Sequence, residues 1–182
     1  MACATRRAFA NLTSDARVRQ QDVVALCDWT SKTVKSLQPR EVQLKNDQAP
    51  VIIFSDAAFE DSVATWGIVV IDPVSGLREV IGGKVDPSLV EFWMQDAGEQ
   101  VITQAEAFAV ALARKCYAKI LSGRRVLAFV DNDPARYALI KASSPSRTLL
   151  QLVQRFHEMA EIDHSVFWIE RVPTESNIAD CV

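Results

Sequence analysis

Short runs of apolar residues begin at position 51 and recur toward the end of the chain, separated by polar segments. Such runs, rich in Val, Ile and Phe, are typical of strands. They predict five strands, over residues 51–56, 66–71, 77–81, 126–131 and 165–169. The segment between the second and third strands contains Asp, Pro, Ser and Gly, so these two strands are expected to form a hairpin.

Longer segments repeat apolar residues at three- and four-residue steps, which is the pattern of helices packed on one side. They predict helices over residues 21–37, 103–121, 134–142 and 147–162, and a last helix that begins at Asn177 and is cut off at Val182. Residues 84–100 contain Pro87 and Gly98 and are expected to be irregular.

The order of these elements predicts an α/β fold. Three hairpin-linked strands are followed by two strands that alternate with helices, so we expect a five-stranded mixed sheet flanked by helices. The composition shifts near position 49. Residues 1–49 are expected to form a helix and a polar linker, and residues 50–182 the α/β domain.

The composition excludes several classes of protein. Hydrophobic residues make up 49% and charged residues 24% of the 182 residues, which is globular composition. No apolar run approaches the ~18 residues of a membrane span, and no secretory signal is found, so we expect an intracellular protein. The formal net charge of −3 excludes a strongly basic protein that binds nucleic acid by bulk charge alone.

The cysteines and histidines do not indicate a zinc site. The four cysteines, at positions 3, 27, 116 and 181, form no CxxC pair and are not spaced with His157 or His164 as zinc ligands are. Cys116 lies on an apolar helical stripe and is expected to be buried. The motifs GxSxG, HExxH and GxxxxGK[ST] are also missing from the sequence.

Two apolar strands run into an aspartate, Asp56 in one case and Asp131 in the other. If these strands are parallel neighbours, both carboxylates lie at the carboxyl edge of the sheet, where open α/β sheets bind ligands. An aspartate after a strand also opens turns or caps helices. Asp133 suits that capping role because a proline follows it, which leaves Asp131 free. Two strands with the same ending favour a functional pair.

Glu106 and Asp180 are two further acidic candidates near predicted helix starts. Glu106 follows Thr103 in a capping-box pattern but lies at the border of the apolar stripe, so cap and ligand are equally compatible with the local sequence. Asp180 lies in the first turn of the last predicted helix, where a carboxylate stabilises the helix dipole. Taken alone, its local sequence favours that structural role.

Four segments together resemble ribonuclease H-like domains, most closely those attached to retroelement reverse transcriptases. The segments are FSDAAFE…WGIVVID, QVITQAEAFAVALA, VLAFVDNDPARYALIKASSPS and FWIERVPTESNIAD, within about residues 50–182. The resemblance implies an RNase H-like fold and hydrolysis of the RNA strand of RNA–DNA hybrids. It also implies that two Mg²⁺ or Mn²⁺ ions are held by four catalytic carboxylates, which by position are Asp56, Glu106, Asp131 and Asp180.

Within this interpretation, six polar residues are candidate contacts to the hybrid, namely Thr103, Gln104, Asn132, Ser144, Ser146 and Arg147. The last three stand at a predicted helix start, which suits a phosphate and equally a simple cap. The tryptophans at positions 66, 93 and 168 are expected in the core. Residues 171–179 lack the histidine that many family members carry there, and the expected partner, a reverse transcriptase domain, is not part of this sequence.

Two alternatives follow from the same residues. A catalytically impaired nucleic-acid-binding or scaffold module would have the same fold with Asp180 misplaced by the incomplete last helix. A 3′–5′ exonuclease of related fold is disfavoured because it would carry an acidic residue where Ala58 stands. The sequence leaves the oligomeric state open.

Overall fold

The computed structural model describes residues 47–98 and 100–180, together with eight separate positions between 24 and 35. The chain divides into two units, residues 1–46 and 47–182. The described positions of the first unit are helical. The rest of the predicted helix 21–37, and the linker up to residue 46, lie outside the described residues.

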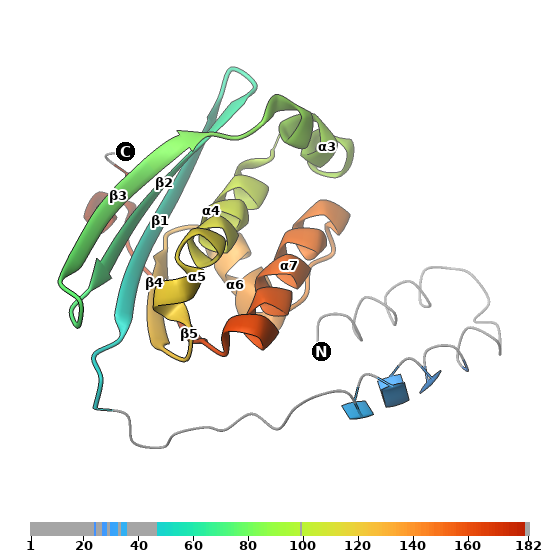
Figure 1. Ribbon diagram of the computed structural model, residues 1–182. Coiled ribbons are helices and arrows are strands. Elements are labelled where there is room, and N and C mark those ends of the chain that lie inside the picture. Colours follow the sequence, from blue (N-terminus) through green and yellow to red (C-terminus); the bar gives the residue numbers. More distant parts are fainter. Residues whose placement is uncertain are drawn as a thin grey trace. The chain divides into compact units, whose positions relative to one another are not determined.

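Five strands of the second unit form one mixed sheet in the order β3-β2-β1-β4-β5 (Figure 1). The strands are β1 Val51–Glu60, β2 Val63–Asp72, β3 Leu77–Lys84, β4 Arg125–Val130 and β5 Val166–Arg171. β2 pairs antiparallel with β1 and with β3, whereas β4 runs parallel to β1 and to β5. The predicted five-stranded mixed sheet is thereby confirmed.

Tight turns set the register of the two hairpins. Asp61 and Ser62 both have positive φ, 48° and 63°, which is the geometry of a two-residue turn whose twist matches that of the flanking strands. In the second turn Gly76 has a φ of 76°, and its N–H donates to the carbonyl of Asp72. The first turn lets β1 and β2 extend well beyond their predicted limits.

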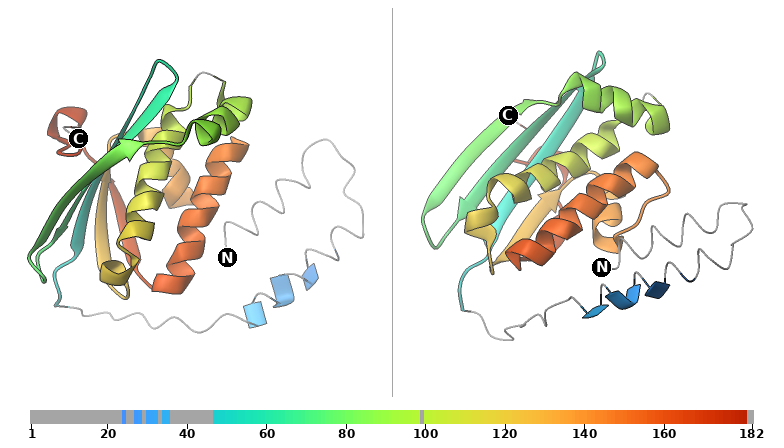
Figure 2. Two further views of the ribbon diagram at one scale, coloured as in Figure 1. Left: turned by 45° about the horizontal axis from the view of Figure 1, so that its top comes forward. Right: turned by 45° about the vertical axis from the view of Figure 1, so that its right-hand side comes forward.

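The helices pack against one face of the sheet (Figure 2). They are α3 Pro87–Ala97, α4 Ile102–Cys116, α5 Ala118–Leu121, α6 Asp133–Lys141 and α7 Arg147–Asp163. Helix α4 is central, because it contacts β1, β2 and α7. None of the helices that the structure describes is long and apolar enough to cross a membrane.

Helix α3 shows that the expectation of irregular structure over residues 84–100 is wrong. Pro87 is the first residue of α3, a position where its missing N–H leaves no hydrogen bond unmade. Asp86 caps this helix by accepting a hydrogen bond from the Ser88 N–H, and Gly98 ends it with a φ of 60°. The proline and glycine that suggested a loop are therefore the start and stop signals of a helix.

The apolar core lies between the sheet and the helices. Its main cluster contains Val51, Ile53, Ile68, Val70, Ala113, Tyr117, Leu121 and Val126, and a second cluster surrounds Trp93. Two expectations about burial are wrong. Cys116 is exposed because the helix ends there and Tyr117 takes the buried place. Trp168 is 66% exposed because it alternates with Phe167 and Ile169 along β5 and so lies on the side of the strand that faces away from the core.

The chain after β5 forms a 3-10 helix, η1 Thr174–Ser176, followed by a turn over residues 178–180. The sequence predicts a helix from Asn177 onward, and the described residues show a single turn there. Asn177 nevertheless acts as its cap, because its Oδ1 accepts a hydrogen bond from the Ala179 N–H. The Asp180 N–H donates to the carbonyl of Asn177 and closes the turn.

Candidate metal centre

The parallel pairing of β1 with β4 places Asp56 and Asp131 beside each other. The last paired residues are Phe54 and Phe129, whose rings stack with centroids 4.8 Å apart, and each aspartate lies two residues further along its chain. β4 ends just before Asp131, whereas β1 continues past Asp56. Asp56 therefore lies inside a strand, not at its end, but at a point where its β4 neighbour has already stopped.

Glu106 approaches the two aspartates from helix α4. Its side chain is 3% exposed, and its Oε2 has no hydrogen-bond partner in the described part of the chain. The helix begins at Ile102, and its cap residue Val101 makes no side-chain cap hydrogen bond, so the capping-box alternative is wrong. A buried oxygen left without a partner costs about 1–3 kcal/mol, and a ligand for Glu106 would remove that cost.

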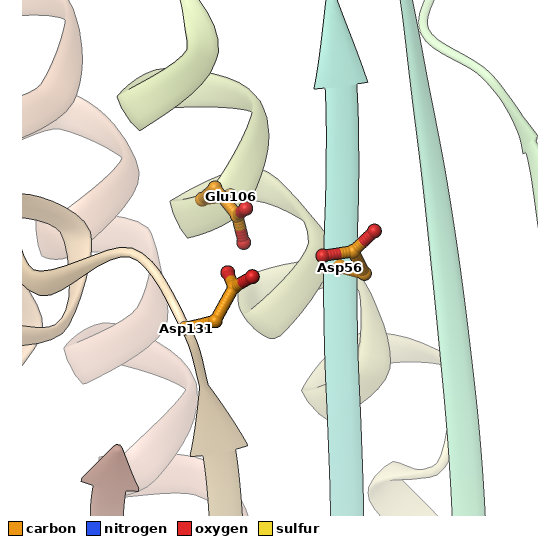
Figure 3. Close-up of side chains that lie close together, drawn as sticks. All are labelled: Asp56, Glu106 and Asp131. Atoms are coloured by element: carbon orange, nitrogen blue, oxygen red, sulfur yellow. The ribbon is translucent and has the colours of Figure 1, made fainter. Parts of the chain in front are cut away.

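One carboxylate oxygen from each of Asp56, Glu106 and Asp131 lies within 4.8 Å of the other two. Figure 3 shows the carboxylates of Glu106 and Asp131 facing each other, with Asp56 beside them on β1. All the donors are carboxylate oxygens, which hard divalent cations such as Mg²⁺ prefer. A cation would also satisfy the partnerless Oε2 of Glu106. The three residues therefore fit a divalent metal.

Burial and mutual repulsion oppose the ionisation of Asp56 and Glu106. Burial, followed by the charges of Asp131 and Asp180, raises the pKa of Asp56 to about 6. Burial, followed by the charges of Asp131 and Asp56, raises the pKa of Glu106 to about 9. Two charges no more than 4.8 Å apart repel by at least about 3.5 kcal/mol at an effective dielectric constant of ~20. The metal-free protein therefore keeps Glu106 protonated near neutral pH.

In the presence of EDTA, the free energy of unfolding is expected to fall as the pH rises from about 5 to about 9. The pKa values of Asp56 and Glu106 are higher in the folded state than the value of about 4 in the unfolded chain. The folded state therefore binds more protons in this window and loses stability as they leave. Urea unfolding at a series of pH values measures the slope.

The matched variants for this measurement are Glu106→Gln and Glu91→Gln, the second at an exposed position on α3. The first should flatten the upper part of the pH profile, and the second should leave it unchanged. A wild-type profile that stays level above pH ~5 would contradict the raised pKa values of the cluster.

Asp180 lies at the margin of the cluster. Its charge and a side-chain hydrogen bond both raise the pKa of Asp56, so the two carboxyls are neighbours. Asp180 is exposed, however, and is not among the three residues whose ligand atoms lie within 4.8 Å. The structure thus brings three of the four predicted carboxylates into one cluster and places the fourth beside Asp56.

Two residues outside the predicted set of site residues contact the cluster. The hydroxyl of Thr174 donates a hydrogen bond to Asp131 Oδ2 at 3.0 Å. Nδ2 of Asn177 donates to Asp56 Oδ1 at 3.3 Å and to the carbonyl of Ser55 at 3.0 Å. The sequence does carry a signal for Asn177, because an asparagine before a predicted first turn is a favoured cap. The sequence carries no signal for the contact between Asn177 and Asp56.

Gln104 and Ser146, two candidate contacts to nucleic acid, lie together at the start of α7. Nε2 of the buried Gln104 donates to Ser146 Oγ at 3.2 Å and to Thr148 Oγ1 at 3.1 Å. Oδ2 of Asp96, from α3, accepts from the Ser146 hydroxyl and the Thr148 N–H. Gln104 Oε1 has no partner among the described residues. These side chains form a connected polar group close to α4.

The other candidate contacts have mainly local roles in the structure. Ser146 caps α7, and the Ser146 N–H donates a hydrogen bond to Ser144 Oγ. Asn132 caps α6 by accepting from the Ala135 N–H, so the expectation that Asp133 is the cap is wrong. Asn132 has the extended backbone that a cap residue requires, and Asp133 instead pairs with an arginine of the same helix. Thr103 is half-buried and Arg147 is exposed.

The sheet has a distinctive topology. Two antiparallel hairpins are followed by two parallel strands, and the helices lie on one face. The chain has a ribonuclease H-like fold, as its likeness to solved structures shows. No family model and no curated protein matches its sequence.

One similar structure is RNase H1 from the halophilic archaeon Halobacterium salinarum, with a TM-score of 0.57 and 20% identity over 73% of this chain and 93% of that chain. Another is the N-terminal RNase H domain of a Mycobacterium tuberculosis protein, with a TM-score of 0.51, 16% identity and coverage of 72% and 88%. A third is LC11-RNase H1 in complex with an RNA/DNA hybrid, with a TM-score of 0.50, 14% identity and coverage of 71% and 91%. At these identities the likeness concerns the fold.

Proposed function

We propose that this protein is a metal-dependent endonuclease that hydrolyses the RNA strand of RNA–DNA hybrids. The observation that carries the proposal is the convergence of Asp56, Glu106 and Asp131 within 4.8 Å on a ribonuclease H-like fold. These residues come from β1, α4 and the end of β4, so only the fold brings them together. Similar solved structures include RNase H1 proteins, one of them in complex with an RNA/DNA hybrid.

In this proposal the site holds two Mg²⁺ or Mn²⁺ ions. The cation ligands would be Asp56, Glu106 and Asp131, with the neighbouring Asp180 as the fourth carboxylate. Such ions activate the attacking water and stabilise the leaving oxygen of a phosphodiester. The carboxylates serve as hard ligands, and their mutual repulsion is relieved when cations bind. The same neutralisation allows a chain of net charge −3 to accept a polyanion at this site.

Ser146 and Arg147, at the start of α7, are proposed contacts to the nucleic acid, and Gln104, which is 2% exposed, would act mainly through its hydrogen bond to Ser146. The Thr148 and Leu149 N–H groups at the start of α7 already donate to Asp96 Oδ2 and Ser146 Oγ, so the exposed Arg147 would supply the contact to phosphate. Thr103, Asn132 and Ser144 are kept as further candidates, with Asn132 also serving as a cap. An RNA–DNA hybrid would be selected by its shape and by contacts to 2′-hydroxyls.

We further infer a retroelement context from the four sequence segments that resemble RNase H domains attached to reverse transcriptases. In that context a reverse transcriptase domain is the proposed partner, and residues 1–49 would connect the two. The residues from 50 onward would form the nuclease domain, acting inside the cell where such hybrids arise.

The proposal is tested with a labelled RNA–DNA hybrid in Mg²⁺, in Mn²⁺ and in EDTA, with RNA–RNA and DNA–DNA duplexes of the same sequence as controls. We expect cuts at internal positions of the RNA strand, only in the hybrid and only with a cation. Binding of the hybrid without cutting under any of these conditions would instead support the catalytically impaired binding module. Cutting that persists in EDTA would contradict the role of the carboxylates.

A further inference from the structure

The segment after β5 reaches the carboxylate cluster through two side chains. Thr174 in η1 donates a hydrogen bond to Asp131 at 3.0 Å, and Asn177 donates one to Asp56 at 3.3 Å. Asp56 lies on β1 and Asp131 follows directly after the neighbouring β4, so a single short segment contacts both. Each hydrogen bond goes to one oxygen of its carboxylate, Oδ2 of Asp131 and Oδ1 of Asp56, and restricts the rotation of that carboxylate.

Asn177 is a buried side chain with several hydrogen-bond partners. It is 4% exposed, and its amide makes three hydrogen bonds. The Ser55 carbonyl accepts from one side of this amide, and the Ala179 N–H donates to the other, so its orientation is defined. The same side chain therefore joins β1, the Asp56 carboxylate and the turn that carries Asp180.

We propose that Asn177 and Thr174 are positioning residues that orient the carboxylates of Asp56 and Asp131 for cation binding. This inference rests on the proposed function, because it assigns a role within the same site. Neither side chain needs to touch the cation or the nucleic acid. Groups that hydrogen-bond metal-ligating carboxylates typically change metal affinity by about 10- to 100-fold when they are removed.

Asn177 has two roles that a variant can separate, because it contacts the Asp56 carboxylate and also caps the turn over residues 178–180. In Asn177→Ser, the serine hydroxyl remains a good cap for the Ala179 N–H but is too short to reach Asp56. Thr174→Val removes one hydroxyl from an exposed residue with little change of shape. Ser176→Ala is the matched control, since Ser176 is an exposed residue of the same 3-10 helix.

The test measures Mn²⁺ binding by isothermal titration calorimetry and by electron paramagnetic resonance, with thermal unfolding in EDTA as the check on folding. We expect Asn177→Ser and Thr174→Val each to raise the Kd for Mn²⁺ by roughly tenfold or more. Ser176→Ala should bind Mn²⁺ as the wild type does. In hybrid cleavage at saturating Mn²⁺, kcat should fall in the first two variants while KM for the hybrid stays the same.

Wild-type Mn²⁺ affinity in folded Asn177→Ser and Thr174→Val would overturn the positioning role. The proposed function would survive that result, provided that the wild type binds Mn²⁺ and cleaves the hybrid. A wild type that neither binds Mn²⁺ nor cleaves the hybrid would overturn both proposals. If Asn177→Ser does not fold, Asn177 is a structural residue and its positioning role is rejected, and Thr174→Val alone decides the role of Thr174.

Discussion

Asp56→Asn is expected to lower the rate of hybrid cleavage by roughly 100- to 1,000-fold while the protein stays folded. Asp56 supplies one of three carboxylate oxygens within 4.8 Å of one another. The asparagine amide offers one oxygen in place of two and carries no charge. A bound cation contributes several kcal/mol to stabilising the charge that develops in the transition state, and this contribution depends on a correctly held ion. Initial rates on a labelled hybrid in Mg²⁺ measure the loss.

The matched control is Asp61→Asn, which makes the same chemical change at the exposed turn between β1 and β2. Asparagine tolerates the positive φ of 48° at that position, so the turn is preserved. This variant should cleave at the wild-type rate. In EDTA, Asp56→Asn should also be more stable than the wild type at pH ~8, because it removes a carboxyl whose pKa burial and its acidic neighbours raise to about 6. Equal cleavage by both variants would remove Asp56 from the site.

Asp163→Ala is expected to lower the free energy of unfolding by about 3–5 kcal/mol. The Arg114 guanidinium, 1% exposed, is bound by both carboxylate oxygens of Asp163 at 2.8 Å and donates to the Ser165 hydroxyl. It also lies over the rings of Phe156 and Phe167. Removing Asp163 would leave this buried cation without its counter-ion, which is a large cost for a domain of typical stability, about 5–15 kcal/mol.

Helix α7 offers a control of the same kind at its surface, where Arg155 and Glu158 form an exposed ion pair at 3.0 Å. Glu158→Ala should cost no more than about 1 kcal/mol in the same urea titration. The double variant Arg114→Met with Asp163→Ala should be more stable than Asp163→Ala alone, because no unpaired charge remains buried. A cost for Asp163→Ala no larger than that for Glu158→Ala would show that the buried pair does not stabilise the fold.

The pH dependence of this ion pair differs from that of the carboxylate cluster. Burial opposes the ionisation of Asp163, but hydrogen bonds from Arg114 and Ser165 outweigh it and hold the pKa of Asp163 below its usual value. Its contribution to stability is therefore present above the unfolded pKa of about 4 and is lost on acidification. Asp56 and Glu106 have raised pKa values, so their ionisation lowers the free energy of unfolding as the pH rises, and it does so at higher pH.

Periodicity located most elements because each apolar run or stripe reports which side of an element faces the core. It placed the five strands, and helices α4, α6 and α7, near their observed positions. It failed at residues 84–100, where Pro87 and Gly98 mark the ends of a helix and not a loop. The expectation of a buried Trp168 is wrong for a different reason, because Trp168 alternates with Phe167 and Ile169 along β5 and lies on the opposite side of the strand.

The pairing of Asp56 with Asp131 could be anticipated because both follow the same kind of apolar strand. The local sequence around Glu106 left its role open, since a capping box and a buried ligand have the same local pattern, and only the family resemblance favoured the ligand role. The lack of a side-chain cap hydrogen bond at Val101 excludes the capping box, and the partnerless Oε2 of Glu106 supports the proposed ligand role. Both observations depend on how α4 packs against β1, a contact between segments distant in sequence.

Local pattern alone determined that this chain forms an α/β sheet, with an acidic residue after each of two apolar runs. Such information is available from the sequence because burial imposes a period on each strand and helix separately. The tertiary structure decided which carboxylates meet, that Asp180 lies at the margin, and that Thr174 and Asn177 contact the cluster. These are contacts between residues up to 121 positions apart, set by strand register and helix packing, which no local period encodes.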